Sequence, residues 1–243
     1  PGFEQIKQRL CLPDGKIDMV LDTDTYNEVD DQFALCYAMR STERLNVKAV
    51  YAAPFFNKRS KSPADGMLKS YNEILNILSI MEYSAPDGFV KKGSDRYLDS
   101  TDTPCRSAAA LDLIEKAMSA EGPIYVVAIG AITNVASALL IEPKIAEKIV
   151  VLWLGGHAFS WSDTYEFNLK QDVLAANVVF DSGVPLVLFP CRGVVSHLST
   201  TLPELEANID GRSPIGSYLT NIVREYSLGR RVYSKVIWDA ATI

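Results

Sequence analysis

The fold is decided by residues 17–31, IDMVLDTDTYNEVDD, where an apolar run passes directly into an acidic one. Residues 17–21 are almost entirely apolar, which is typical of a strand buried on both faces of a parallel sheet. After the polar stretch, residues 31–40 repeat apolar side chains at helical spacing. A buried strand followed by a helix predicts the first half of a βαβ unit.

The same alternation of apolar strands and helices continues along the chain. We expect further strands at 47–53, 124–129, 149–154 and 186–189, and helices at 67–81, 107–118, 134–141 and 172–181. Apolar strands separated by helices predict an α/β fold with an open, mostly parallel, Rossmann-like sheet flanked by helices. No repeat or linker interrupts the pattern, so residues 1–243 are expected to form a single domain.

The composition excludes several classes of partner. The chain has 24 Lys and Arg against 30 Asp and Glu, and its net charge is −6. Because no basic stripe is present, we expect neither nucleic-acid nor membrane-surface binding. The longest apolar stretch, residues 124–132, is too short to span a membrane, and no secretion signal is expected. Four scattered cysteines indicate reduced thiols, so we expect a cytoplasmic protein without structural zinc.

An acidic cluster follows the first strand. Within ten positions the chain carries Asp22, Asp24, Glu28, Asp30 and Asp31. In open parallel sheets, ligands bind beyond the carboxyl ends of the strands, which is where this cluster falls. A helix cap explains one or two of these acids, but five carboxylates repel one another unless a cation compensates them. Hard divalent ions take several carboxylate oxygens, so a metal site is favoured over a helix cap.

These residues carry a resemblance to a known family. A strand that runs into Asp-x-Asp, followed by Asp-Asp at the start of a helix, resembles the N-terminal signature of the inosine-uridine-type nucleoside hydrolases. Later segments are similar to the family in the same order, and they are VYAAPFFN ending at Asn57, VVAIGAITNVA at 126–136, VLWLGG at 151–156, EFN at 166–168, DVLAANVVFDSGVPLVLFP at 172–190 and WDAAT at 238–242. The chain is therefore identified as a divergent, bacterial-like member.

The sequence also departs from the family pattern. Five residues separate Asp24 from Asp30, where the family has three. The family's His-Gly segment has no counterpart, and the loop between Gly156 and Glu166 is short. Because relatives continue well beyond the position of Asp239, we expect that the C-terminal part of the family domain is missing.

The resemblance implies hydrolysis of the N-glycosidic bond of ribonucleosides, in nucleoside salvage. It implies a Ca²⁺ ion held by Asp24, Asp31, Asp239 and the backbone carbonyl of Ile129, with Asp24 also acting as the general base. All-oxygen ligands suit such a hard cation. It further implies a homodimer or homotetramer, and sugar contacts from Asp30, Asn57, Glu166 and Asn168. Glu166 and Asn168 also have a plainer explanation, as the caps of an ordinary polar loop.

Recognition of the base is expected to involve Trp238 and His157. Trp238 stands where many relatives have a histidine before the last metal ligand, and it resembles the purine-specific branch of the family. Stacking on the indole would assist departure of a purine, although a large aromatic residue is also common in a core. His157 follows Gly155-Gly156 beyond a strand end, and His197 is a weaker candidate.

Two alternatives stay open. VLDTDT also resembles the opening of haloacid-dehalogenase-type phosphatases, in which Asp22 would be the nucleophile and Asp24 the acid, but Tyr26 stands where that motif has Thr or Val. A non-catalytic or altered-specificity relative that binds ribosides or sugars is the second alternative, because the loop spacing is altered and the His-Gly segment is missing. Release of a reducing sugar or of phosphate distinguishes these functions.

Overall fold

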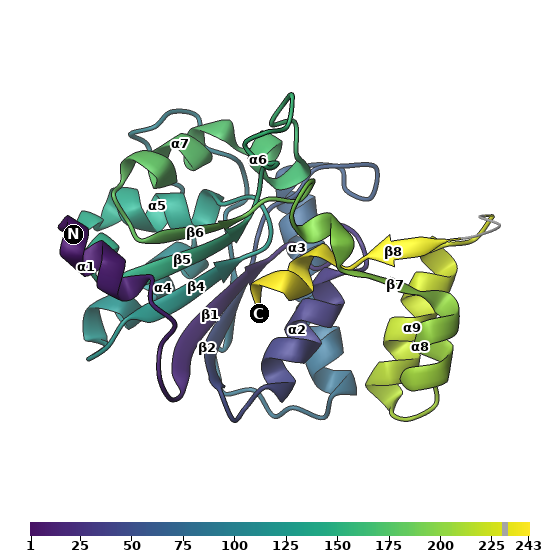
Figure 1. Cartoon of the computed structure of the whole chain (residues 1–243). Helices are drawn as coiled ribbons and strands as arrows, with labels where there is room; N and C mark the ends of the chain where they lie inside the picture. Colours follow the sequence, from purple (N-terminus) through teal and green to yellow (C-terminus); the bar gives the residue numbers. More distant parts are fainter. Residues whose placement is uncertain (230–232) are drawn as a thin grey trace.

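The computed structural model describes residues 1–229 and 233–243, and its centre is a six-stranded sheet with the order β3-β2-β1-β4-β5-β6 (Figure 1). Each pair of neighbouring strands in this sheet is parallel. The strands are β1 (Ile17–Thr23), β2 (Leu45–Ala52), β3 (Val90–Lys92), β4 (Ile124–Ala128), β5 (Ile149–Leu154) and β6 (Leu186–Phe189). The predicted α/β fold with an open parallel sheet is confirmed.

The strand order creates a crevice beside β1. The chain runs outward from β1 through β2 to β3, and then returns to place β4 on the other side of β1. The two strands pair from Met19 with Tyr125 to Asp22 with Ala128, so their carboxyl ends are adjacent. The segments that leave these ends diverge to opposite sides, which is the position where open α/β sheets bind ligands.

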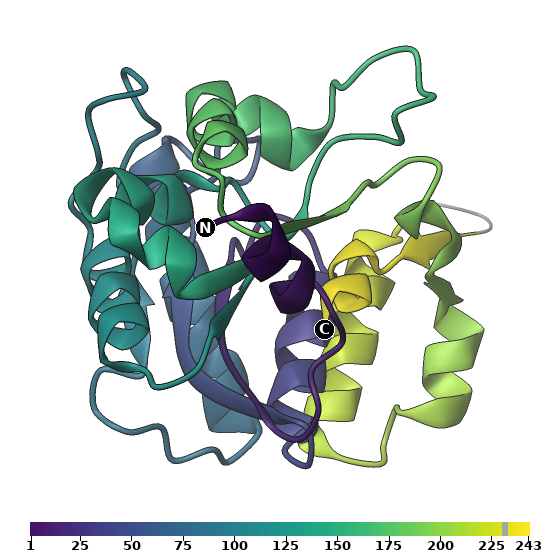
Figure 2. The same cartoon turned by 60° about the vertical axis from the view of Figure 1, so that its left-hand side comes forward.

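Helices cover both faces of the sheet, because the strands present apolar side chains on both faces. One core, which includes Val126 and Trp153, is enclosed by α4 (Ala108–Ser119), α5 (Thr133–Ile141) and α7 (Val173–Asp181). The other core, which includes Met19 and Leu21, is enclosed by α2 (Asp31–Arg40) and α3 (Pro63–Ile80). Figures 1 and 2 show the two helical layers on either side of the sheet.

The helix predicted at 67–81 is longer than expected at its start. The side chain of Ser62 accepts a hydrogen bond from the Asp65 N–H, and Pro63 occupies the first turn, so α3 begins at Pro63. The other predicted elements agree with the structure to within a few residues. No helix in residues 1–229 or 233–243 has both the length and the apolar character that a membrane crossing requires.

The sequence patterns predicted no helix or strand after residue 189, but the structure forms a second layer there, which consists of the helices and strands between residues 195 and 242. β7 and β8 pair in an antiparallel sheet, and α9 packs Ile215 and Leu219 against the side of the core formed by α2 and α3 (Figure 1). Elements of three to seven residues are too short to show a period, which explains why most of this layer was missed. The elements without a prediction are α1 (Phe3–Arg9), η1 (Pro143–Glu147), α6 (Phe167–Gln171), η2 (Val195–His197), β7 (Ser199–Thr201), α8 (Leu202–Asn208), α9 (Pro214–Tyr226), β8 (Ser234–Val236) and η3 (Trp238–Thr242), besides β3.

Candidate active site

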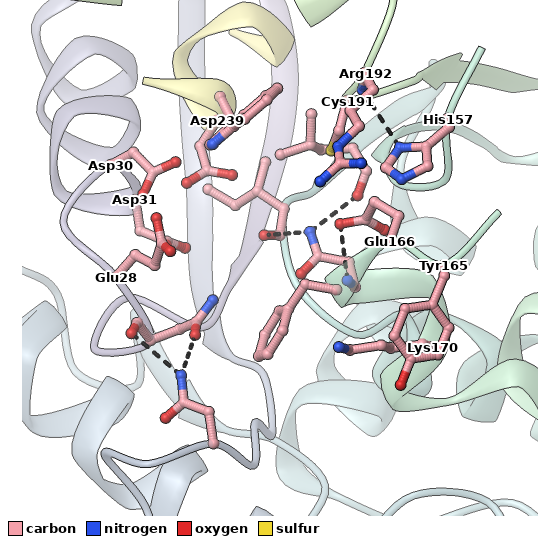
Figure 3. Close-up of a pocket in the computed structure, with 17 residues that line it drawn as sticks. Glu28, Asp30, Asp31, His157, Tyr165, Glu166, Lys170, Cys191, Arg192 and Asp239 are labelled. Atoms are coloured by element: carbon pink, nitrogen blue, oxygen red, sulfur yellow. Dashed lines mark hydrogen bonds between the residues drawn. The ribbon is translucent and has the colours of Figure 1, made fainter. Parts of the chain in front are cut away.

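A pocket of about 370 Å³ is lined by residues that follow β1, β4 and β5 and by residues of the C-terminal segment (Figure 3). Nine of the ten residues predicted for the site line it: Asp30, Asp31, Asn57, Ile129, His157, Glu166, Asn168, Trp238 and Asp239. The tenth, Asp24, is fully buried and does not line the pocket. The fold therefore gathers residues that are separated by up to about two hundred positions in the sequence.

Three carboxylates meet at one wall of the pocket. One oxygen from each of Asp30, Asp31 and Asp239 lies within 4.8 Å of the others, and all three residues are buried. Asp31 begins α2 and accepts a hydrogen bond from the Thr23 hydroxyl at 2.6 Å. The short 3-10 helix η3, which contacts α2, brings Asp239 to the same place from the other end of the chain.

Asp30 does not act as a helix cap. It occupies the N-cap position of α2, but its side chain accepts no hydrogen bond from the N–H groups of that helix. Its carboxylate instead contacts Lys235 of β8, with 3.0 Å between Asp30 Oδ1 and Lys235 Nζ. The simple explanation of this acid as a cap therefore does not hold.

Burial and mutual repulsion make these acids reluctant to ionise. Burial, followed by the negative charges of Asp31 and Asp30, raises the pKa of Asp24 well above its usual range. Burial and Asp30 raise the pKa of Asp31 to about 7, and burial raises the pKa of Asp22 to about 7. The pKa of Asp239 is also raised, first by burial and then by Asp31. A positive charge at this place would reverse these shifts.

Asp24 supplies the clearest indication that this site suits a positive charge. It is inaccessible to solvent, and neither of its carboxylate oxygens has a hydrogen-bond partner in the described part of the chain. Gly130 makes the close packing possible, because a Cβ at this position would lie 3.1 Å from the Asp24 Cγ. Unpaired buried carboxylate oxygens are costly, and the surrounding donor set is made of oxygen atoms. These residues fit a hard divalent cation.

Lys235 contributes to the site but was missed by sequence reasoning. Its side chain is 4% exposed and also lies 2.6 Å from Glu28 Oε2. Burial alone would lower the pKa of Lys235, but the attraction of Asp30 and Glu28 outweighs it and raises that pKa. The only signal in the sequence is one charged residue in the apolar run before Asp239, which does not identify its partners.

Glu166 and Asn168 organise the opposite wall. The Glu166 carboxylate accepts hydrogen bonds at 2.9 Å from the N–H groups of Gly156, Asn168 and Leu169. Asn168 Nδ2 donates to the carbonyls of Ile129 at 3.1 Å and Leu154 at 3.0 Å. The capping role that the sequence allowed for Glu166 is therefore present, and both side chains also line the pocket.

Of the remaining candidate residues, Asn57, His157 and Trp238 line the pocket and His197 does not. Asn57 Nδ2 donates to Asn27 Oδ1 at 2.6 Å, and Asn27 belongs to the loop that is longer than in the family pattern. His157 is buried, with its Nδ1 accepting from the Arg192 N–H at 3.4 Å. Trp238 is partly buried against the core, whereas His197 is exposed and does not line the pocket. The pocket residues that were not predicted are Asn27, Glu28, Leu154, Tyr165, Phe167, Lys170, Cys191 and Arg192.

Comparison with known proteins identifies similar sequences over most of the chain. The sequence profile of the family described as inosine-uridine preferring nucleoside hydrolase matches residues 19–242. The pyrimidine-specific ribonucleoside hydrolase RihA of Klebsiella pneumoniae (strain 342) is 28% identical over 232 residues, which cover 85% of this chain and 69% of RihA.

Two further comparisons differ in how much of each protein they cover. The putative pyrimidine-specific ribonucleoside hydrolase RihB of Shigella boydii serotype 4 (strain Sb227) is 36% identical over 141 residues, which are 56% of this chain and 55% of RihB. The chain thus aligns with little more than half the length of that relative. A solved structure of a plant nucleoside hydrolase, PpNRh1, superposes with a TM-score of 0.72 at 22% identity, covering 95% of this chain and 77% of PpNRh1. This likeness shows the fold.

Proposed function

The chain belongs to the inosine-uridine preferring nucleoside hydrolase family, a family of N-ribosyl hydrolases, and we propose that it hydrolyses purine ribonucleosides to the free base and ribose with the help of Ca²⁺. One observation carries the proposal: Asp239, near the C-terminal end of the sequence, lies with Asp30 and Asp31 at the end of the first strand. These carboxylates lie in the crevice beside β1, where open α/β sheets bind ligands. A bound divalent cation would offset the repulsion between them.

The proposed mechanism assigns the proton transfer to Asp24. Cleavage of an N-glycosidic bond passes through an oxocarbenium-like ribose that water attacks. Ca²⁺ bound by Asp24, Asp31, Asp239 and the Ile129 carbonyl would supply charge that lowers the pKa of a water molecule and orients it. Asp24 takes up the proton, because its oxygens accept no hydrogen bond from the described residues and are free to act as a base. The Ile129 carbonyl already accepts from Asn168, but an oxygen with two lone pairs can serve both partners.

The sugar is proposed to bind between the two walls of the pocket. Asp30 would accept hydrogen bonds from ribose hydroxyls on the acidic wall. Glu166 lies across the pocket from Asp30 (Figure 3), and Asn168 and Asn57 also line the pocket. Glu166 is held by three backbone N–H groups, so its main contribution is to keep the opposite wall in place.

The purine preference is proposed because Trp238 lines the pocket next to Asp239. An indole face offers a large stacking surface to a purine. The sequence relatives RihA and RihB are named as pyrimidine-specific, so a pyrimidine preference is the competing candidate. His157 also lines the pocket and is proposed to lie near the base.

Replacing Trp238 with Ala should lower kcat/KM for inosine and guanosine about tenfold or more, because stacking of one base contributes roughly 1–3 kcal/mol. Uridine, with a smaller ring, should lose less. Phe159→Ala removes an aromatic ring that is 97% exposed and does not line the pocket, so this control should leave both values unchanged. Equal losses for purines and pyrimidines in the Trp238 variant would remove stacking from the mechanism.

The function is tested by incubating the protein with Ca²⁺ and inosine, adenosine, guanosine, uridine or cytidine, and measuring the free base and the reducing sugar. Release of both products in equal amounts, fastest with a purine ribonucleoside, is expected. Faster release from uridine or cytidine would establish the pyrimidine preference. Binding without release would indicate the non-catalytic alternative, and phosphate release from a sugar phosphate would indicate the phosphatase alternative.

Three further properties are proposed from the sequence. We place the protein in the cytoplasm, which is supported by four free cysteines in the described residues. We treat residues 1–243 as one domain, and we propose that the protein forms a homodimer or homotetramer. Light scattering coupled to size-exclusion chromatography measures the mass of the assembly directly.

A further inference from the structure

We propose that Lys235 is a positioning residue that orients Asp30 toward a hydroxyl group of the sugar, and that it thereby makes the site select an intact ribose over deoxyribose. The inference rests on the proposed function of the pocket and adds to it a residue that determines sugar specificity. It is carried by the contacts of Lys235, which comes from the second layer of the molecule and pairs with Asp30 and Glu28, two residues that line the pocket.

A chain of hydrogen bonds connects this layer to the acidic wall. The Tyr226 hydroxyl, at the end of α9, donates to Glu28 Oε1 at 3.0 Å. Lys235 Nζ, on β8, donates to Glu28 Oε2 at 2.6 Å and to Asp30 Oδ1 at 3.0 Å. Glu28 belongs to the loop between Asp24 and Asp30 that has five residues instead of the family's three. The loop that is two residues longer than in the family pattern thus carries Glu28, which is a partner of Lys235.

Burial makes this arrangement rigid. The side chains of Lys235 and Asp30 are each 4% exposed, so neither can exchange its partner for bulk water. Hydrogen bonds between charged groups in such surroundings are shorter and stronger than those between neutral groups. Removing one member of a buried pair leaves the other without its partner, and the Asp30 carboxylate would then be able to rotate.

The geometry leaves one oxygen of Asp30 for the substrate. Oδ1 is occupied by Lys235, whereas Oδ2 accepts no hydrogen bond from another residue in the described part of the chain. Asp30 lines the pocket beside Asp31 (Figure 3). A carboxylate that is fixed in this way accepts a hydrogen bond from a sugar O–H in one orientation.

This arrangement predicts selection against deoxy sugars. A site built to pair with a hydroxyl rejects an analogue without it, because the buried carboxylate oxygen is then left without a donor. The rejection depends on Asp30 being held in place. If Lys235 is removed, Asp30 can turn away, and the penalty for a missing hydroxyl becomes smaller.

The test compares inosine with 2′-deoxyinosine and 3′-deoxyinosine as substrates of the wild type, Lys235→Met and Lys235→Arg. We expect the wild type to discriminate against at least one deoxy substrate. In Lys235→Met, kcat/KM for inosine should fall through a higher KM, and the ratio of inosine to that deoxy substrate should fall at least tenfold. Lys235→Arg keeps the positive charge and should recover part of the ratio. An equal loss for all three substrates in Lys235→Met would mean that Lys235 has only a structural role and would overturn the proposal.

Two controls separate specificity from folding. Lys116→Met removes another partly buried cation, which pairs with Asp112 at 2.7 Å and does not line the pocket, so the ratio should stay at the wild-type value. If Lys235→Met does not fold, Glu28→Gln removes one partner of Lys235 from a position that is 38% exposed. This variant should lower the ratio at least threefold, and an unchanged ratio would contradict the proposal.

A binding measurement distinguishes failure of this inference from failure of the proposed function. 1,4-Anhydro-D-ribitol is a ribofuranose ring without a base, and it cannot be hydrolysed. By titration calorimetry, the wild type should bind it more tightly than its 2-deoxy analogue, and Lys235→Met should lose that difference. If no nucleoside is hydrolysed, the proposed function fails, but this comparison still decides the role of Lys235. Equal binding of the two rings by the wild type would contradict the proposal, because Asp30 and Lys235 would then not select the sugar by its hydroxyl group.

Discussion

Asp24→Asn should lower the rate of nucleoside hydrolysis by a factor of about 1,000 or more, while raising the melting temperature of the metal-free protein. The rate falls because the variant loses a proton acceptor and a ligand of the cation, and general-base catalysis alone is worth 10²–10⁴-fold. The melting temperature rises because the change removes a fully buried carboxylate whose oxygens have no donor and which faces Asp31.

The measurement pairs steady-state kinetics with thermal unfolding in EDTA and in Ca²⁺. Ca²⁺ should stabilise the wild type and have little effect on Asp24→Asn. Asp18→Asn is the matched control, because Asp18 lies near the opposite end of β1, is partly exposed, and is far from the pocket in the sheet. Full turnover in Asp24→Asn, or undiminished stabilisation by Ca²⁺, would exclude Asp24 as base and ligand.

In the absence of divalent cations, the protein should become less stable as the pH rises from 5 to 8. The pKa values of Asp22 and Asp31 are raised to about 7 in the folded state, compared with 3.8 in an ordinary environment. The folded state therefore holds protons that the unfolded chain has released. This contribution is fully present below about pH 4 and is lost as the pH rises through 7. A shift of this size amounts to a few kcal/mol, or about 10 °C in melting temperature.

Ca²⁺ should reverse this dependence. The ion binds the ionised carboxylates, so its stabilising effect increases with pH as protons leave the cluster. Differential scanning calorimetry at pH 5, 6, 7 and 8, with EDTA or with Ca²⁺, measures both curves. In Asp31→Asn, the part of the pH dependence that comes from Asp31 should disappear. A melting temperature of the metal-free wild type that is constant or increases between pH 5 and 8 would contradict the raised pKa values of Asp22 and Asp31 in the folded state.

The sequence supports the prediction of the central fold because the evidence is local. Each strand of the sheet that is four or more residues long contains a mostly apolar run, and each covering helix repeats apolar residues at its own period. The second layer was not predicted, since β7 and β8 have three residues each and show no period. The one long helix in it, α9, has the Ser213 cap and Pro214 in its first turn as signals that could have been used.

The residue types of the site were also present in the sequence, but their roles depend on contacts. The spacing of Asp24, Asp30 and Asp31 predicts that acids gather at the end of β1. It does not show that Asp30 turns away from its helix toward Lys235, or that Glu166, besides capping its own helix, also accepts a hydrogen bond from the Gly156 N–H. Such contacts depend on where distant segments pack, and no local pattern encodes them.

The amino-acid sequence by itself determined the alternation of strands and helices, the parallel sheet, and the acidic character of the edge beyond β1. The family resemblance implied that Asp239 joins that edge, but the tertiary structure alone decided that Lys235 reaches it, 205 positions from Asp30 along the chain. The physical reason is the separation along the chain over which each effect acts. Hydrophobic periodicity is set within one helix or strand, so it can be recognised from neighbouring residues. The energy of a buried charge depends on every group packed around it, and those groups come from distant parts of the chain.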